Sequence, residues 1–186
     1  MDTLIALEAT ASPAFAPCEF RVQWASTAWE HHEALALRRA VFCVEQGVFV
    51  GSDLDAIDRD ARCIVAVSQV GGAPDQVVGT VRIHEERPGL WWGSRLAVHA
   101  AFRQHGRIGA TLIRLAVSSA NALGCERFLA HVQSQNVPMF ERLGWKALQP
   151  ETLHGRPHHL MEASLAAYPA CSDPHAGYVT HSGGRR

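Results

Sequence analysis

The sequence predicts an α+β fold in which helices pack against a mixed central β-sheet. Segments rich in β-branched residues alternate with segments of helical spacing, in the order β-α-β-β-β-α-β-α-β-β. Strands separated by interleaved helices favour parallel neighbours, whereas strands separated by short turns favour hairpins, so this order indicates a sheet with both kinds of pairing. A chain of 186 residues is long enough for one full hydrophobic core.

The first half of the chain contains four expected strands and one long helix. Alternation at residues 18–24 predicts the first strand. Thr27 is a suitable N-cap for a helix over residues 29–46, and Gly47 ends that helix. An acidic loop follows at residues 52–60. The remaining strands are a hairpin of residues 63–70 and 77–84, joined through a Gly-Gly-Ala-Pro turn, and a strand at 89–99.

The second half contains two expected helices and three expected strands. A helix over residues 106–123 ends at Gly124, and a short helix over 138–143 ends at Gly144. The strands are expected at residues 128–133, 145–148 and 159–165. We assign residues 18–167 to one domain, and we expect a disordered leader at 1–17 and a disordered tail at 168–186, because both are poor in periodic apolar residues.

Composition excludes several classes of protein. The formal net charge is −1, which gives no reason to expect a nucleic-acid partner. No apolar run is long enough to span a bilayer, so we expect no membrane partner. Asp2 and Glu8 stand where a signal peptide would be positively charged, so we do not expect secretion. Five cysteines without a Cys-x-x-Cys pair indicate reduced thiols, a cytoplasmic location and no zinc site.

The junction before the long helix, Leu96-Ala97-Val98 followed by residues 99–110, is suited to bind a phosphate. Small residues let backbone amides converge there, and the N-terminus of the helix adds partial positive charge. Arg103 and Arg107 add two cationic groups. An ordinary strand-to-helix turn is the alternative interpretation of this segment.

This junction, Leu-x-Val followed after five residues by Arg-x-x-Gly-x-x-Gly, resembles the acetyl-CoA motif of the GNAT acyltransferases. The segment Asn136-Val-Pro-Met-Phe-Glu-Arg-Leu-Gly-Trp145 is similar to another motif of that family. The resemblance implies a sheet splayed in its middle, with acetyl-CoA as co-substrate in the gap. The residues implied to bind it are Leu96, Ala97, Val98, Arg103, Gln104, His105, Gly106, Arg107, Ile108, Gly109, Asn136 and Phe140.

Two positions depart from the pattern of the family. Ile108 stands where the last small residue of the loop is expected, which predicts an altered loop geometry. Phe140 stands where many members carry a tyrosine that protonates the departing thiolate, so the usual proton donor is missing. Because of the second departure, a non-catalytic module that binds acyl-CoA without turnover is an alternative interpretation of the chain.

A second pattern narrows the resemblance. Residues 38–47 read Arg-Arg-Ala-Val-Phe-Cys-Val-Glu-Gln-Gly, the acidic loop follows, and residues 78–82 read Val-Gly-Thr-Val-Arg. This combination resembles a branch of small bacterial GNAT proteins, acetyltransferase-like and encoded near nitrilases. It is also similar to acyl-homoserine-lactone synthases, which use acyl-carrier protein and S-adenosylmethionine but lack an Arg-x-x-Gly pyrophosphate loop.

Several polar residues are candidates for the acceptor site and the chemistry. Asp53, Asp55 and Asp58 either form an acidic rim that attracts an amine or belong to a solvated loop, and Arg39 and Trp92 are assigned to the same site. Acyl transfer to an amine needs a base, for which His84 and His131 are the best placed by their strands; a purely structural histidine is the favoured alternative at each position. Glu45, at a helix C-terminus that does not favour a carboxylate, is either catalytic or paired with an arginine.

We therefore expect an N-acetyltransferase that moves acetyl from acetyl-CoA to an amine of a small molecule by direct attack in a ternary complex. No metal is expected in the reaction, and the chain is expected to be a monomer or a homodimer. A lactone-synthase-like activity on S-adenosylmethionine is the main alternative.

Overall fold

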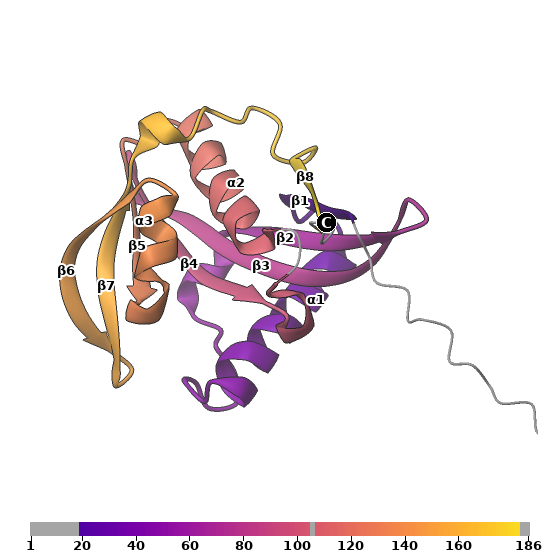
Figure 1. The fold of residues 1–186 in the computed structure, drawn as a ribbon, viewed down its shortest axis with the longest axis horizontal. Helices are drawn as coiled ribbons and strands as arrows, with labels where there is room; N and C mark the ends of the chain where they lie inside the picture. The colour runs from indigo at the N-terminus through magenta and orange to yellow at the C-terminus, as the bar shows by residue number, and fades with distance from the viewer. Residues whose placement is uncertain (1–18, 105–106, 183–186) are drawn as a thin grey trace, which may run out of the picture.

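The computed structural model describes residues 19–104 and 107–182. It contains one sheet of eight strands in the order β6-β7-β5-β4-β3-β2-β1-β8 (Figure 1). Only β4 and β5 pair in parallel, and every other neighbouring pair is antiparallel. The fold is therefore α+β with a mixed sheet, which confirms the fold class that the sequence predicts.

The first part of the chain follows the expected order of elements. β1 (Glu19–Trp24) leads to α1 (Ala28–Arg38), which Thr27 caps through a capping box with Glu30. The helix continues as a π-helical segment, Arg39–Glu45, and Gly47 follows with φ of +62°. After a short 3-10 helix, Ala56–Arg59, the strands are β2 (Arg62–Val70), β3 (Ala73–Arg87) and β4 (Leu90–Val98).

The second part begins with α2 (Ile108–Ala122), which ends in a Schellman motif at Gly124, because the Cys125 amide donates to the Ala120 carbonyl and the Gly124 amide to Asn121. The remaining elements are β5 (Arg127–Gln133), α3 (Val137–Arg142), β6 (Trp145–Leu153), β7 (Arg156–Ala163) and β8 (Tyr178–His181). β6 is longer than residues 145–148, and it forms a hairpin with β7.

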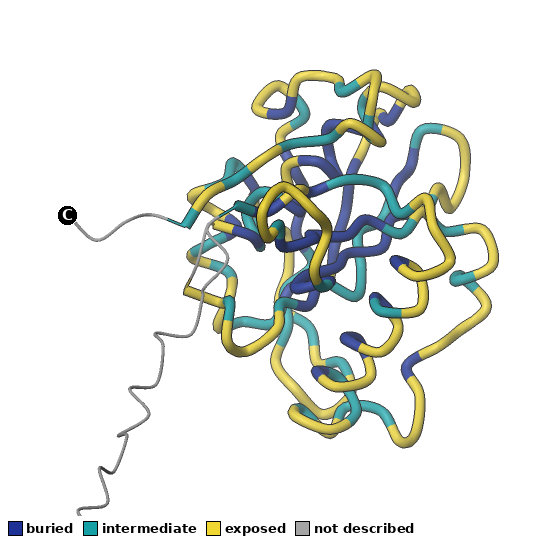
Figure 2. The backbone as a smooth tube through the Cα atoms, turned by 90° about the vertical axis from the view of Figure 1, so that its right-hand side faces the viewer, coloured by how far each residue is buried: buried dark blue, intermediate teal, exposed yellow. Residues whose placement is uncertain are grey.

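The two faces of the sheet are covered by different helices. α2 and α3 lie over one face and bury the larger core, which includes Leu112, Leu115, Phe128 and Met161. α1 lies over the other face, where Ala34 and Leu37 pack on a smaller core. Figure 2 shows the buried backbone concentrated in the central strands. Because this core is small, polar side chains occupy part of the sheet face that α1 covers.

The prediction of a disordered tail at 168–186 is wrong for residues 168–182. Tyr168 is buried, and its hydroxyl accepts a hydrogen bond from Trp145 Nε1 at 2.9 Å and donates to the Leu143 carbonyl. The chain then passes over α2, where the Cys171 amide donates to the Ser118 carbonyl, and ends as β8 on the edge of β1 (Figure 1). The predicted leader at 1–17 lies outside the described residues.

Gly177 explains why the tail can reach β1. Its φ is +59°, and a Cβ built on it would lie 1.9 Å from the Val22 carbonyl oxygen. Only glycine permits this approach of one backbone to another. The tail thus docks through backbone pairing and one buried ring rather than through a periodic apolar pattern.

Candidate functional site

The sheet opens between β4 and β5. The pairing of these parallel strands begins with Leu90 opposite Arg127 and ends with Gly93 opposite Ala130. The rest of β4, from Ser94, and of β5, from His131, border a cavity of about 450 Å³. Backbone groups of both strands therefore face a space that another molecule can enter, as the resemblance to a splayed sheet implies.

A bulge on β4 accompanies the opening. Thr80 pairs with Ala97 and Arg82 pairs with Ser94, so Val81 of β3 faces two residues of β4, Arg95 and Leu96. Arg95 takes the left-handed conformation, with φ of +57°. A non-glycine residue in this conformation carries strain, and such residues concentrate at functional sites. The bulge turns the Arg95 side chain towards the acidic loop.

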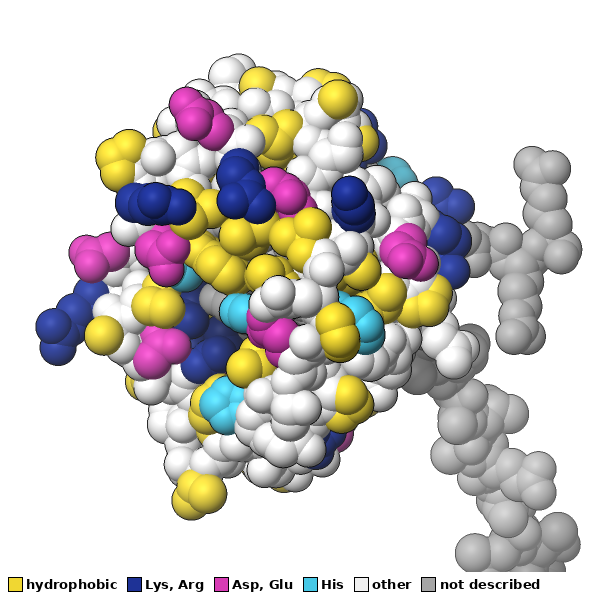
Figure 3. Space-filling model, turned by 90° about the vertical axis from the view of Figure 1, so that its left-hand side faces the viewer, with side chains coloured by type: hydrophobic (Ala, Val, Ile, Leu, Met, Phe, Trp, Pro, Cys, Tyr) yellow, Lys and Arg dark blue, Asp and Glu magenta, His cyan; other side chains and the backbone are white. Residues whose placement is uncertain are grey.

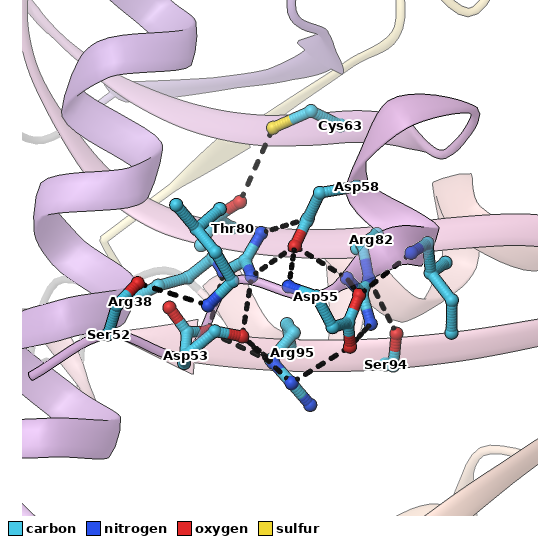
Figure 4. A network of polar contacts seen from close by, with 12 residues as sticks. Arg38, Ser52, Asp53, Asp55, Asp58, Cys63, Thr80, Arg82, Ser94 and Arg95 are labelled. Atoms are coloured by element: carbon cyan, nitrogen blue, oxygen red, sulfur yellow. Dashed lines mark hydrogen bonds and ion pairs between the residues drawn. The ribbon is translucent and has the colours of Figure 1, made fainter. Parts of the chain in front are cut away.

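Three arginines hold the acidic loop (Figure 4). Arg38 of α1 contacts Asp53 at 2.8 Å and Asp58 at 2.6 Å. Arg82 of β3 contacts Asp55 at 2.6 Å and Asp58 at 2.8 Å. Arg95 contacts Asp53 at 3.0 Å and Asp55 at 3.1 Å. Each carboxylate meets two guanidinium groups, so these six side chains, which we call the Arg–Asp network, carry no net charge.

The three aspartates of the predicted acidic rim are therefore all paired with arginines, and Asp53 is not open to an acceptor. The side chain of Asp53 is 3% exposed and that of Arg38 is 4% exposed, so this pair belongs to the interior. A solvated loop, the alternative interpretation, does not describe Asp53 either. Of the three aspartates only Asp55 lines the cavity, together with Arg82 and Arg95. The network forms one rigid wall of the site.

The pKa values of the network carboxylates follow from these contacts. The hydrogen bond from Arg82 lowers the pKa of Asp55 despite partial burial. Burial raises the pKa of Asp58, but hydrogen bonds from Arg38, the Asp55 amide and Arg82 outweigh it and hold that pKa well below the ordinary range. Both groups are ionised at neutral pH.

The loop before α2 carries part of the expected phosphate site. Arg107 is the N-cap of α2 in the left-handed conformation, with φ of +51°, and Gly109 lies in the first turn. Ile108, the departure from the family pattern, is buried under the sheet. His105 and Gly106 lie outside the described residues.

Arg103 and Glu45 form an ion pair at 2.6 Å, and Arg103 Nε also donates to the Val98 carbonyl. The hydrogen bond from Arg103 lowers the pKa of Glu45. Glu45 is therefore paired with an arginine, which is the alternative to a catalytic role. Glu45 does not line the cavity, and we leave it out of the proposed chemistry.

The cavity brings together most of the other candidate residues. His84, Trp92, Leu96, His131, Asn136 and Phe140 all line it, whereas Ala97 is buried under α1. Arg39 lies elsewhere, with Nε donating to the Gly51 carbonyl at the surface. Burial and the nearby charge of Arg82 lower the pKa of His84, so its ring is neutral at neutral pH. Phe140 packs edge-on against Trp145, with ring centroids 5.1 Å apart.

Two segments that sequence reasoning did not assign close the cavity from opposite sides. One is the stretch after α1, with Phe42, Gln46 and Phe49, and the other is the β6–β7 turn, with Leu153 and His154. The Gln133 amide donates to Gln46 at 3.0 Å, Arg156 donates to the Gln46 carbonyl, and the rings of Phe49 and His154 lie 4.9 Å apart. Figure 3 shows histidines beside a recess among hydrophobic side chains.

Sequence reasoning also missed the Arg–Asp network and Glu151. Arg38 and Arg82 stand in the quoted motifs, but nothing in their spacing shows that they meet the acidic loop. Glu151 of β6 contacts His131. In the sequence only His131 stands out locally, because it is a histidine flanked by apolar residues on a predicted strand, and nothing marks Glu151 as its partner.

Among the described residues no group of three or more histidines, cysteines, aspartates or glutamates is arranged to hold a metal. No described helix is long and apolar enough to cross a membrane.

The chain is similar to known acetyltransferases. The model of the Acetyltransferase (GNAT) family matches residues 14–145. A protein of Bacillus subtilis (strain 168) named "Putative acetyltransferase BSU40680" is 29% identical over 137 residues, which are 70% of this chain and 86% of that protein.

Two solved structures share the fold. The crystal structure of a putative N-acetyltransferase from Lactobacillus plantarum matches with a TM-score of 0.70 and 23% identity, over 78% of this chain and 98% of its own. TofI, crystallised in a ternary complex with an inhibitor and MTA, matches with a TM-score of 0.57 and 18% identity, over 80% of this chain and 95% of its own.

Proposed function

The chain belongs to the acetyltransferase (GNAT) family and is an acyltransferase, and from this premise we propose that it moves the acetyl group of acetyl-CoA to an amine of a small molecule by direct attack in a ternary complex. The observation that carries the proposal is the opening between β4 and β5, with its cavity of about 450 Å³, which Ile113 and Ala116 of α2 also line. We place the reaction in the cytoplasm.

Acetyl-CoA fits this opening by its chemistry. The pantetheine arm carries amide groups, and the edge of β4 beyond Gly93 offers backbone groups that β5 does not pair in the described part of the chain. The pyrophosphate suits the amides and the positive dipole end of α2, beside Arg103 and Arg107. The bound thioester would supply the acetyl group, and the protein would position it and exclude water.

The acceptor side of the cavity supports a small molecule rather than a protein chain. The contacts of Gln46 with Gln133 and Arg156, and of Phe49 with His154, bridge the space between the two closing segments. A peptide would have to break these contacts to enter. The walls combine aromatic rings, including Trp92 and Phe49, with the carboxylates of Glu86 and Asp55.

A second candidate is an activity on S-adenosylmethionine like that of acyl-homoserine-lactone synthases. The observation in its favour is the sequence pattern of residues 38–47 and the acidic loop, which the structure joins in the Arg–Asp network. The phosphate-suited N-terminus of α2, with two arginines, favours CoA instead.

The test combines ligand protection with a reaction. We expect acetyl-CoA, but not S-adenosylmethionine, to raise the melting temperature of the protein. A panel of small-molecule amines is then incubated with acetyl-CoA, and released thiol is measured. Thiol release with at least one amine, and the acetylated amine by mass spectrometry, would support the proposal. Protection by S-adenosylmethionine alone would favour the second candidate, and CoA binding without thiol release from any amine would contradict the proposed reaction.

A further inference from the structure

His131 and Glu151 form a pair at the rim of the cavity. His131 lies on β5 and Glu151 on β6, and β7 runs between these two strands. The side chains reach over β7, and His131 Nδ1 lies 2.8 Å from Glu151 Oε2. Both side chains are partly shielded, at 37% and 21% exposure. The contact therefore fixes one nitrogen of an imidazole that lines the cavity.

Trp92 fixes the plane of the same imidazole. Its ring stacks on His131 with centroids 5.0 Å apart and planes 21° apart, and its Nε1 donates to Glu86. The His131 ring is thus held by one ion-pair contact, with Glu151, and by one stacked face, with Trp92. Such support is typical of a group whose orientation matters for binding or chemistry.

The carboxylate also selects the tautomer. A carboxylate only accepts hydrogen bonds, so a neutral His131 must carry its proton on Nδ1 to satisfy Glu151. Nε2 then holds the free lone pair and is the nitrogen that can take up a proton. The contact with Glu151 leaves Nε2 available on the other side of the ring.

His84, the other candidate base, has the opposite environment. A base becomes cationic when it accepts a proton, and the positive charge of Arg82 lies close enough to lower the pKa of His84. The carboxylate of Glu151 on β6 contacts His131, and the imidazole of His158 on β7 lies near that carboxylate. On the other face of the ring, Trp92 stacks on His131 and donates to the carboxylate of Glu86. The environment of His84 thus makes it the poorer candidate for the base.

Resting on the proposed function, we propose that Glu151 is a positioning residue that holds His131 as the base for the acceptor amine. The lone pair of the amine forms a bond to the thioester carbonyl carbon, and the amine gives one proton to Nε2 of His131. The C–S bond breaks, the electron pair leaves on the sulfur, and the imidazolium returns that proton to the thiolate. The products are the acetylated amine and free CoA thiol, and His131 thereby also supplies the proton donor that Phe140 lacks.

The first test measures the tautomer and needs no acceptor. The protein is labelled with ¹⁵N-histidine, saturated with CoA, and the ring nitrogens of His131 are assigned by their loss in His131→Gln. We expect the Nδ1-protonated tautomer in the wild type and a shift towards the Nε2-protonated form in Glu151→Leu. Glu162→Leu is the matched control, because Glu162 is a carboxylate of the neighbouring strand β7 that pairs with Arg127 and does not line the cavity. An Nε2-protonated wild type, or an unchanged tautomer in Glu151→Leu, would overturn the proposal.

The second test measures the reaction with the best amine of the panel. We expect Glu151→Leu to lower kcat about 10-fold or more and His131→Gln about 100-fold or more, both with unchanged KM for acetyl-CoA. Because Glu151 acts through His131, the double variant should be no slower than His131→Gln alone. Additive losses would refute the positioning role. If no amine releases thiol, the proposed function fails. The tautomer measurement still decides whether Glu151 positions His131.

Discussion

Replacing Arg38 by Met should reveal how strongly the Arg–Asp network stabilises the fold. The guanidinium of Arg38 contacts Asp53 at 2.8 Å and Asp58 at 2.6 Å, and both Arg38 and Asp53 are almost fully buried. Met keeps the apolar volume of the stem, but among the described residues it leaves Asp53 with a single ionic partner, Arg95. Removing one partner of a buried ion pair costs about 3–5 kcal/mol.

The expected loss is large enough to measure directly. For a chain of this size about 3–5 kcal/mol corresponds to a fall in melting temperature of about 6–20 °C. Urea unfolding followed by tryptophan fluorescence gives the free energy of unfolding. Arg127→Met is the matched control: Arg127 pairs with Glu162 at 2.7 Å but is 52% exposed, so little change is expected.

A second substitution separates charge from packing. If the excess negative charge that Arg38→Met leaves in the network causes the loss, adding Asp53→Asn should recover part of it, because one carboxylate charge is removed. An Arg38→Met protein as stable as the wild type would refute the assignment of the network as a structural wall. A loss that Asp53→Asn does not reduce would show that packing, and not charge, is the cause.

Three further outcomes follow from the structure. The free energy of unfolding should fall as pH drops from about 5 to about 2. The folded pKa values of Asp55 and Asp58 lie below their unfolded values, so the unfolded chain binds more protons in this range. Urea unfolding at several pH values measures this slope, and Arg38→Met should flatten it. Tyr168→Phe should lower the free energy of unfolding by about 1–3 kcal/mol, since Trp145 Nε1 loses its acceptor; equal stability in the same assay would mean that the tail contributes nothing there. Phe140→Tyr should raise kcat or leave it unchanged, because a hydroxyl is added at nearly constant ring volume; a large fall in kcat with unchanged acetyl-CoA affinity would show that the apolar ring packs against the acyl group or the acceptor.

Local sequence signals were sufficient for most of the fold. Thr27 followed by Glu30 is a capping box in the sequence and in the structure, and Gly124 ends α2 as its position indicates. These features depend on residues within a few positions of one another. The mixed character of the sheet could be inferred from the order of these elements, because helices and short turns restrict the possible connections.

The features that the sequence did not reveal depend on distant contacts. β8 is short and polar, and it pairs with β1 through backbone groups that any sequence supplies, apart from the close approach at Gly177. The acidic loop has the same charges whether it is solvated or paired, and only the fold brings Arg38, Arg82 and Arg95 to it. Glu151 likewise reaches His131 only because β5, β7 and β6 are neighbours.

The central claim is that acetyl-CoA binds with its pyrophosphate at the N-terminus of α2, and a calorimetric titration with acetyl-CoA tests it most directly. Gly109 lies in the first turn of α2, and a Cβ there would meet only Val98, at 3.9 Å, so a side chain can be added. A glutamate at this helix end suits the dipole and should not destabilise the fold, but it repels a pyrophosphate. We predict that the wild type binds acetyl-CoA, that Gly109→Glu weakens binding at least 10-fold, about 1.4 kcal/mol, and that the neutral Gly109→Gln weakens it less. No binding by the wild type, or equal affinity of the Glu and Gln variants, would contradict the account.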